Sequence, residues 1–324
     1  MRDARPPEED DVSTGPSPQK RGFWPIPVYR EYIEKHTSRG ERRDLTHPDG
    51  EVWNDDYPNI VIANTSMQKW MSDNNIVSLN DRDMSFRSLR AIYRLETARH
   101  IEGVKGWLEQ IKRWRTGLAL LAEIASPDEQ ECRIVPYRDG KLNAYEWGRD
   151  DIAETANGAL VDRSALGNSE LGSGEGSDAV IEFTPDIWKG EAMRPPSDAP
   201  DEVLFHELVH ASRTMRGVSD KKIVTRGYGD QEEYIAVVLT NIYMSEKGQR
   251  VFAGSHGSKI LQGLDLEFFL DNSQHVNLSP MQLLDNFRWS QPAFYKALAD
   301  LPPERPKYNW VRLHRDRRKH QQTF

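Results

Sequence analysis

Residues 206–210 of this chain read His-Glu-Leu-Val-His, and this stretch decides which fold and which chemistry we expect. On a helix, His206 and His210 are one turn apart and project from the same face. That spacing lets both imidazoles reach a single Zn²⁺. It also places Glu207 beside the first ligand, where a carboxylate can act as a general base on a water molecule. The motif therefore predicts a zinc hydrolase, and specifically a metalloprotease.

The residues around the motif predict a helix that begins at Pro200 and ends at Gly217. Proline suits a first helical position because its missing N–H would be unpaired there in any case. Acidic residues at 201–202 place negative charge in the first turn, where the helix dipole favours it. Arg213 and Arg216 occupy the last turn, and glycine can end a helix in the left-handed conformation. The motif is therefore expected in the middle of a helix, as metal binding requires.

A catalytic zinc site needs a third protein ligand. One protease class supplies a histidine six residues after its second motif histidine, but that position holds Arg216, so this class is excluded. An aspartate ligand would be Asp220 or Asp230. A glutamate ligand would come from a second helix, which the segment 231–241 predicts.

Within that second helix, Glu233, Ala236 and Thr240 share one face, and the small side chain at 236 lets the helix approach the first one closely. We therefore predict Glu233 as the third ligand, ahead of Glu232 and then Asp230. Glu232 points about 100° away on the helix. Its carboxylate is expected to accept a hydrogen bond behind the ligands or to face solvent.

The predicted chemistry follows from these groups. Zinc lowers the pKa of a bound water from about 15.7 to about 7 and polarises the scissile carbonyl. Glu207 would take the water proton and return it to the leaving amine. The tetrahedral intermediate needs an oxyanion partner. Tyr228 is the first candidate, because the glycines within 226–229 make that loop adjustable, and Tyr243 and His256 are weaker candidates.

Residues 179–184 alternate with period two, which is typical of a half-buried strand. Val180 and Glu182 would face one side, and Ile181 and Phe183 the other. We expect this strand to form the sheet edge that pairs with an extended peptide substrate. The glycine-rich stretch 167–177 before it is predicted to be a flexible loop.

Further strands are predicted at 59–63, 76–79 and 132–137. Apolar residues at three- and four-residue steps predict helix over 85–125, and glycines within it favour a pair of helices over a single one. Residues 258–300 are also predicted to be helical. The expected fold class is therefore α+β: a zincin-like metallopeptidase core with a small mixed sheet, the motif helix and the glutamate helix, plus additional N- and C-terminal helical regions.

Composition suggests how the chain is divided. Residues 1–22 are rich in proline, serine and charge, which predicts a disordered tail. We expect a mixed and helical region at 23–125, the zincin-like catalytic domain at 126–300, and a basic C-terminal tail at 301–324.

Bulk properties exclude several classes of protein. A net charge of −8 argues against a nucleic-acid partner. Cys132 is the single cysteine, so no internal disulfide can form, and the chain suits a reducing cytosol. No apolar run approaches the roughly 18 residues that a membrane helix needs, so no stable membrane insertion is expected. The N-terminus has no apolar core, so it is not expected to be a cleaved signal peptide, and any export would use a route that needs none.

The motif at 206–211, followed by Glu-Tyr-Ile-Ala at 233–236, resembles the gluzincin pattern, in which a Glu-x-x-Ala helix supplies the third ligand. The lethal factor class of bacterial toxin proteases has this pattern, and so do the zinc metallopeptidase effectors that enterobacteria inject into host cells. The resemblance extends over residues 116–250 at most. It implies a zincin fold, zinc as cofactor and a protein substrate. It also implies synthesis in the bacterial cytoplasm without a cleaved signal peptide, and delivery into a target cell by a specialised secretion system. By analogy, it also implies an immunity protein or a secretion chaperone as a partner.

Two other functions compete with this interpretation. A zinc hydrolase of a non-peptide amide is disfavoured by the predicted edge strand, because small substrates do not need strand pairing. A scaffold or binding protein with a structural or vestigial metal site is the second alternative. A structural site would be closed by four protein ligands, and no fourth histidine or cysteine stands at a suitable spacing. Glu207 would also have no role in such a site.

Overall fold

The structure is a computed structural model, and the chain divides into the units Met1–Leu45 and Thr46–Phe324. All residues described below belong to the second unit. The predicted disordered tail at 1–22 and the predicted strand at 76–79 lie outside the described residues, and the predicted domain boundaries stay predictions. The structure describes residues 50–64, 67, 70–71, 86–127, 130–136, 152–153, 160–162, 170–172, 174–184, 199–220, 230–249, 251–253, 260–262, 268–270 and 278–321.

A mixed sheet forms the base of the described fold. Its five strands run in the order β1-β2-β3-β7-β4. The central strands β2, β3 and β7 are parallel to one another, and β1 and β4 join them antiparallel at the two sides. The α+β class and the strands predicted at 59–63, 132–137 and 179–184 are thereby confirmed. The strands are β1 (Gly50–Val52), β2 (Ile60–Ala63), β3 (Cys132–Val135), β4 (Ile152–Ala153) and β7 (Ala179–Glu182).

The alternation in β7 is confirmed, but its predicted place at the sheet edge is wrong. Ile181 and Phe183 are buried, while Val180 is partly exposed. Strand β4 pairs with β7 on the side away from β3, with Ile152 opposite Ile181 and Ala153 opposite Val180. A strand of two residues is too short to show a periodic pattern in the sequence. The edge on this side of the described sheet is therefore β4.

The helical stretch after β2 is a pair of helices, as predicted: α3 (Phe86–Lys112) and α4 (Arg115–Ile124). The break is not where the glycines are. Gly103 and Gly106 lie inside α3, and Gly117 lies in the first turn of α4. The number of helices is thus right, but Gly103 and Gly106 do not interrupt α3. Gly117 does matter beside the break, because a Cβ there would lie 2.0 Å from the Ile111 carbonyl oxygen.

The start of α4 is fixed by a residue far away in the sequence. Trp114 adopts extended backbone at the N-cap and offers no side-chain cap. The buried carboxylate of Glu246 instead accepts the backbone N–H groups of Arg115 (3.0 Å) and Thr116 (2.8 Å) and the Thr116 hydroxyl (2.6 Å). A carboxylate at this position satisfies donors that a helix start leaves unpaired, and it complements the helix dipole.

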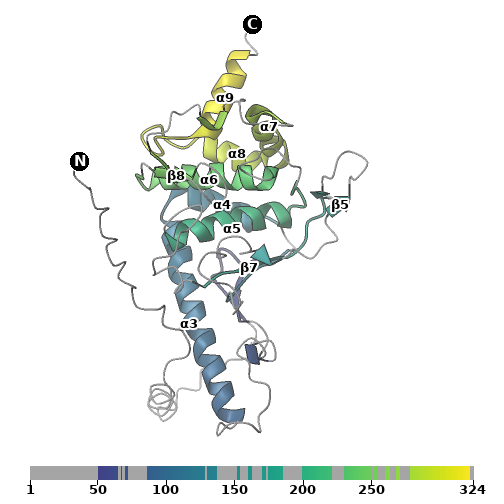
Figure 1. Ribbon diagram of the computed structural model, residues 1–324, viewed down its shortest axis with the longest axis vertical. Coiled ribbons are helices and arrows are strands. Elements are labelled where there is room, and N and C mark those ends of the chain that lie inside the picture. The colour runs from purple at the N-terminus through teal and green to yellow at the C-terminus, as the bar shows by residue number, and fades with distance from the viewer. Residues whose placement is uncertain are drawn as a thin grey trace, which may run out of the picture. The chain divides into compact units, whose positions relative to one another are not determined.

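Two helices cross the middle of the fold, α5 (Pro200–Met215) and α6 (Gln231–Glu246). Helix α5 packs against β7, α3, α4 and α6, and Figure 1 shows α5 and α6 side by side with β7 next to α5. Every residue of 201–215 is buried. The polar side chains of this segment must therefore find partners within the protein, since an unpaired buried polar group is costly.

The stretch predicted as a flexible loop at 167–177 contains a strand. Strand β6 (Glu170–Gly172) pairs antiparallel with β5 (Leu160–Asp162). The N–H of Gly172 donates to the carbonyl of Ser219, just beyond α5, at 2.7 Å. A Cβ added at Gly172 would lie 2.0 Å from the Gly217 carbonyl oxygen. Glycine here permits a close approach of two backbones, and the sequence pattern alone was misread as flexibility.

The predicted helical region at 258–300 is confirmed in its second half. Before it lie a small hairpin of β8 and β9 and the short 3-10 helix η4. No helix in the described part of the chain is long and apolar enough to cross a membrane. The elements of this region are β8 (Val251–Ala253), β9 (Ile260–Gln262), η4 (Phe268–Leu270), α7 (Pro280–Ser290) and α8 (Pro292–Ala299).

The basic C-terminal stretch contains a helix that the sequence analysis missed, α9 (Trp310–Gln321). Its first residues, Trp310 and Val311, are buried. The Trp310 ring meets Phe252 at 5.8 Å and Phe269 at 4.6 Å between centroids. The many charges of this stretch led us to predict a tail, although the apolar residues at its start are buried.

Candidate metal centre

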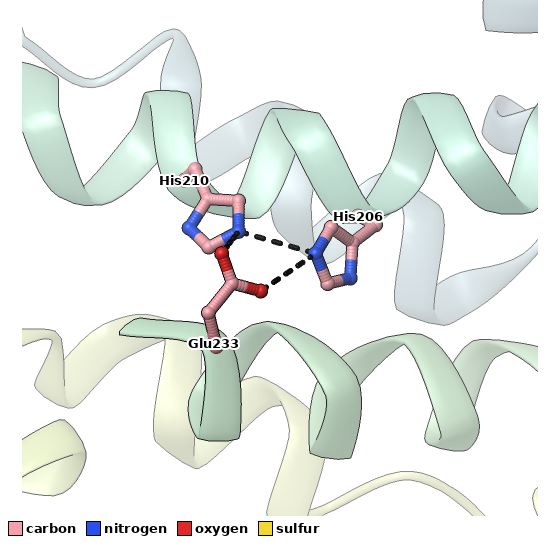
Figure 2. Close-up of side chains that lie close together, drawn as sticks. All are labelled: His206, His210 and Glu233. Carbon is pink, nitrogen blue, oxygen red and sulfur yellow. Dashed lines mark hydrogen bonds and ion pairs between the residues drawn. The ribbon is translucent and has the colours of Figure 1, made fainter. Parts of the chain in front are cut away.

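The helix that carries the motif forms as the sequence predicts. Pro200 opens α5 after Ala199 in extended conformation, and Gly217 follows its end with a φ of +63°. Because His206 and His210 are four residues apart, both imidazoles leave the helix on the face that meets α6. Figure 2 shows the two rings and the Glu233 carboxylate pointing toward one another from the two helices.

Three ligand-type side chains meet between these helices. The Nε2 atoms of His206 and His210 are 3.2 Å apart. The Nε2 atom of His206 lies 3.4 Å from Oε2 of Glu233, and that of His210 lies 3.5 Å from Oε1. Among the residues that the structure describes, these three form the one group of histidine, cysteine and acidic side chains that could hold a metal ion.

The spacing of these groups is compatible with one shared zinc ion. Zn–N and Zn–O bonds of about 2.0–2.2 Å at tetrahedral angles place two ligand atoms about 3.3–3.5 Å apart. The histidine nitrogens are 3.2 Å apart, and each lies 3.4 or 3.5 Å from a different oxygen of Glu233. With one atom taken from each residue, the three atoms lie within 4.8 Å of one another. Three protein ligands leave a fourth position for water or substrate, which is the arrangement of catalytic zinc sites.

The electrostatics of the site favour a positive charge between the three side chains. Burial of His210 favours its neutral form, but the Glu233 carboxylate outweighs this and raises the pKa of His210 to about 9. Burial would raise the pKa of Glu233, yet the neighbouring His210 and His206 imidazoles hold it well below its usual range. Glu233 also lies in the first turn of α6, at the positive end of the helix dipole. A divalent cation can supply the charge that this arrangement stabilises.

The structure brings Glu233, and not the alternative acidic residues, to the imidazoles. Asp230 is the N-cap of α6, where its carboxylate accepts the Glu233 N–H at 3.0 Å. Burial raises the pKa of Asp230 to about 6. Glu232 is buried and turned toward Arg213, as expected for a carboxylate behind the ligands. The backbone N–H of Asp220 donates to the same Glu232 carboxylate at 2.6 Å.

The predicted contact face of α6 also meets α5. Ala236 is completely buried. The hydroxyl of Thr240 lies 3.4 Å from Nδ1 of His206. A partner that accepts the Nδ1 proton leaves the Nε2 lone pair for a metal, which is how histidine ligands are commonly oriented.

The structure describes only some of the predicted catalytic residues. Glu207 is buried beside the first histidine, and its negative charge helps to raise the pKa of His210. Tyr228, predicted to stabilise the oxyanion, lies outside the described residues, as does His256. Tyr243 is engaged elsewhere, since its hydroxyl donates to Asp201 at 2.7 Å.

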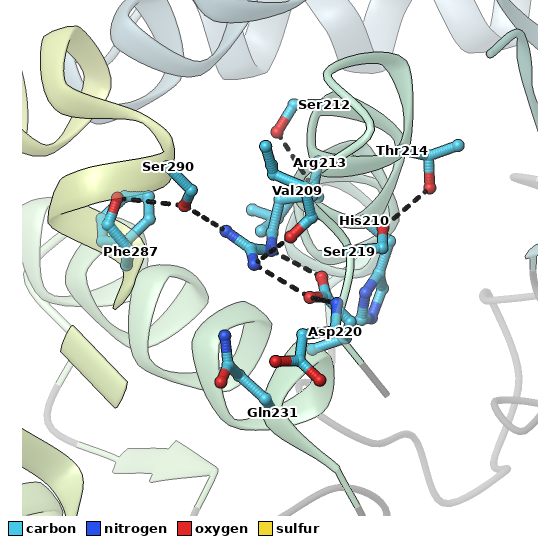
Figure 3. Close-up of polar contacts among 12 residues, drawn as sticks. Val209, His210, Ser212, Arg213, Thr214, Ser219, Asp220, Gln231, Phe287 and Ser290 are labelled. Carbon is cyan, nitrogen blue, oxygen red and sulfur yellow. Dashed lines mark hydrogen bonds and ion pairs between the residues drawn. The ribbon is translucent and has the colours of Figure 1, made fainter. Parts of the chain in front are cut away.

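A buried arginine next to the site was missed in its true role. Sequence analysis treats Arg213 as a favourable charge at a helix end, but its side chain is completely buried. It forms a bidentate ion pair with Glu232, from Nε to Oε2 at 2.5 Å and from Nη2 to Oε1 at 2.9 Å. Nη1 donates to Gln291 (3.1 Å) and Ser290 (3.4 Å), and Nη2 to the Val218 carbonyl (2.9 Å). Figure 3 shows part of this network, including the bond from Arg213 to Ser290. The available sequence signal was the position of Arg213, three residues after the second histidine.

A second buried ion pair ties the same two helices together at their other ends. The Nζ atom of Lys247, just after α6, lies 2.6 Å from Oδ2 of Asp201 and 2.6 Å from Oε1 of Glu202. Both acidic side chains belong to the first turn of α5. The three ligand-type side chains therefore lie between two buried ion pairs that join α5 to α6.

Fold and site together define a class. A His-Glu-x-x-His helix and a glutamate-bearing helix, packed on a small mixed sheet, are consistent with a zincin-like metallopeptidase core.

Comparison with known families makes the class more specific. Residues 95–249 match the model of Peptidase M91, a metallopeptidase family described as effector protein. The matched segment contains α4, α5 and α6 and all three ligand-type residues. The resemblance to effector metallopeptidases is thereby confirmed over that segment. Searches of curated proteins and of solved structures gave no significant match.

Proposed function

We propose that this chain is a zinc-dependent endopeptidase that hydrolyses peptide bonds of a protein substrate, with His206, His210 and Glu233 as the zinc ligands. One observation carries the proposal: two imidazoles and a carboxylate from two helices meet with one ligand atom of each residue within 4.8 Å of the others. The match of this segment to a metallopeptidase effector family supports the same function.

The side chains around the ligands have distinct proposed roles. A bound zinc would polarise the scissile carbonyl and lower the pKa of water at the open position. Glu207 follows His206 directly, and its carboxylate would take a proton from the attacking water and deliver it to the leaving amine. Tyr228 remains our proposed donor to the oxyanion of the tetrahedral intermediate.

The sheet supports a polypeptide as the substrate. Because β4 pairs with the outer side of β7, an extended substrate would pair with β4 and not with β7. Pairing with a sheet edge recognises the backbone of a peptide, whereas a small amide has too few backbone groups to pair. This favours a protein substrate over a non-peptide amide.

The effector family also supports a proposal about where the enzyme acts. The description of the matched family as effector protein supports our proposal that the substrate lies in a target cell reached through a specialised secretion system. A secretion chaperone, or an immunity protein that protects the producing cell, would be a partner by the same reasoning.

The test is a comparison of new protein N-termini. Extract of a candidate target cell is treated with the zinc-loaded wild type and with zinc-loaded Glu207→Gln, and the N-termini are identified by mass spectrometry. We expect a set of new N-termini with the wild type that a chelator abolishes and that the variant does not produce. The proposal fails if the two proteins give the same N-termini, or if the wild type takes up no zinc.

A further inference from the structure

We propose that Arg213 and Glu232 are positioning residues for the metal ligand Glu233: their ion pair holds the first turn of α6 against the last turn of α5. The inference rests on the proposed function, since it takes Glu233 as a zinc ligand. It assigns to two residues outside the ligand set the task of keeping the glutamate carboxylate in front of both imidazoles.

The two cross-helix contacts lie side by side. Arg213 follows His210 by less than one turn of α5, and Glu232 is the residue directly before Glu233 in α6. The pair Arg213–Glu232 is therefore adjacent to the pair His210–Glu233. Its two parallel hydrogen bonds, at 2.5 and 2.9 Å, fix the orientation of the carboxylate as well as its distance.

The guanidinium is itself held from several sides. All five of its N–H donors have acceptors, because it bonds Ser290, Gln291 and the Val218 carbonyl in addition to the two oxygens of Glu232. Gln291 in turn donates to Glu123 of α4 at 3.1 Å. The arginine therefore has one defined position relative to α4, α5 and the start of α8.

The first turn of α6 depends on contacts of this kind. The first N–H groups of a helix have no intrahelical partner, so the turn is held by side chains and by its packing. Here Asp230 caps the turn, Gln231 accepts from Asn286 at 3.1 Å, and Glu232 binds Arg213. Glu233 belongs to the same turn, so a loosened turn moves a ligand.

The need to hold α5 and α6 together does not by itself explain why they are joined by a buried ion pair. Arg213 is completely buried and Glu232 is 5% exposed. Transfer of two charges from water is expensive, and apolar side chains of similar volume usually hold two helices together at least as well. An arginine and a carboxylate provide a fixed geometry that apolar contacts lack.

The chain supplies a matched control at the other end of the same helices. Glu202 is also a buried glutamate, 1% exposed, and it pairs with Lys247 at 2.6 Å. A Glu→Gln change at 202 or at 232 removes the same charge from an α5–α6 ion pair. Only the change at 232 affects the turn that carries Glu233.

The experiment measures zinc affinity and stability separately. Wild type, Glu232→Gln, Glu202→Gln and Glu233→Ala are compared by zinc competition with a chromophoric chelator, by the visible spectrum of the Co²⁺ form, and by urea unfolding of the metal-free proteins. We expect Glu232→Gln to weaken zinc binding by about 10- to 100-fold and to change the Co²⁺ spectrum. Glu202→Gln should lower stability and leave the zinc affinity and the spectrum unchanged.

The outcomes separate this inference from the proposed function. If Glu233→Ala binds zinc as the wild type does, the proposed metal site fails and the inference with it. If Glu233→Ala loses zinc but Glu232→Gln keeps wild-type affinity and spectrum, only the positioning role fails. It also fails if both Glu→Gln variants lose zinc affinity in proportion to their loss of stability.

A second variant covers the case in which Glu232→Gln does not fold. Arg213→Lys keeps the positive charge but loses the planar fork that binds both carboxylate oxygens. We expect weaker zinc binding and an altered Co²⁺ spectrum in this variant too. Wild-type zinc affinity in a folded Arg213→Lys protein would overturn the proposal.

Discussion

The Nε2 atom of His206 and the Oε2 atom of Glu233, from two helices that are separated in the sequence by the segment 216–230, lie 3.4 Å apart. Neither residue is a ligand by itself. The contact arises because α5 and α6 pack against each other, and the small Ala236 of α6 is completely buried. The predictions below follow from this arrangement and from the contacts around it.

Zinc should stabilise the folded protein, because the three ligand-type side chains meet only in the native fold. At a zinc concentration of 100 times Kd, the free energy of unfolding should rise by about 2.7 kcal/mol. Thermal unfolding with and without zinc measures this, and His210→Ala should show no shift. An equal shift in that variant would mean that zinc binds elsewhere.

Replacement of Glu207 by glutamine should separate metal binding from catalysis. The amide cannot accept the proton of the attacking water, and general-base catalysis contributes about 10²–10⁴-fold to a rate. We therefore expect kcat against the identified substrate to fall by about that factor, while the zinc content by mass spectrometry stays at the wild-type value. A variant with full activity would remove Glu207 from the mechanism.

The thiol of Cys132 should be unreactive in the folded protein. Burial raises its pKa to about 12, so at pH 8 the side chain is a neutral thiol. Cys132 is the first residue of β3 and is completely buried. A thiol reagent at pH 8 should label the chain only after denaturation with urea. Rapid labelling of the native protein would contradict the burial of this strand.

Alanine at two glycines next to α5 should have unequal effects. Gly174 and Gly176 both have positive φ, of +88° and +78°, so alanine costs backbone strain at either position. A Cβ at Gly176 would lie 1.9 Å from the Met215 carbonyl oxygen, whereas one at Gly174 meets nothing within 4 Å. Gly176→Ala should therefore lose about 1–3 kcal/mol more than Gly174→Ala in urea unfolding. Equal losses would refute the close contact.

Local pattern accounts for much of the fold. Helix α5 could be predicted from Pro200 to Gly217 because local residues specify its start and its end. The charged residues in its first and last turns also suit the helix dipole. Glu233 could be ranked first because helical periodicity places it on the face of Ala236 and Thr240. The central strands also carry local signals: 179–184 alternates with a period of two, and 59–63 and 132–137 are short, largely apolar runs.

Contacts between distant residues could not be read from local pattern. The carboxylate of Glu246 starts α4, the two residues of β4 cover β7, and Trp310 anchors α9, and each depends on a partner far away in the chain. Arg213 was missed for the same reason: its charge suits a helix end, and only the position of Glu232 shows that it is buried in an ion pair.

Two carboxylates near the opposite ends of α6 connect this helix to two different neighbouring helices. Glu233 faces the imidazoles of α5, and Glu246 holds the first turn of α4. The same helix thus contacts both α4 and α5, and the ligand-type cluster exists only once α5 and α6 have packed together. An unfolded chain offers scattered donors instead of a site, so metal uptake reports completed folding. Appearance of the Co²⁺ absorption during refolding would time the moment at which α5 and α6 come together.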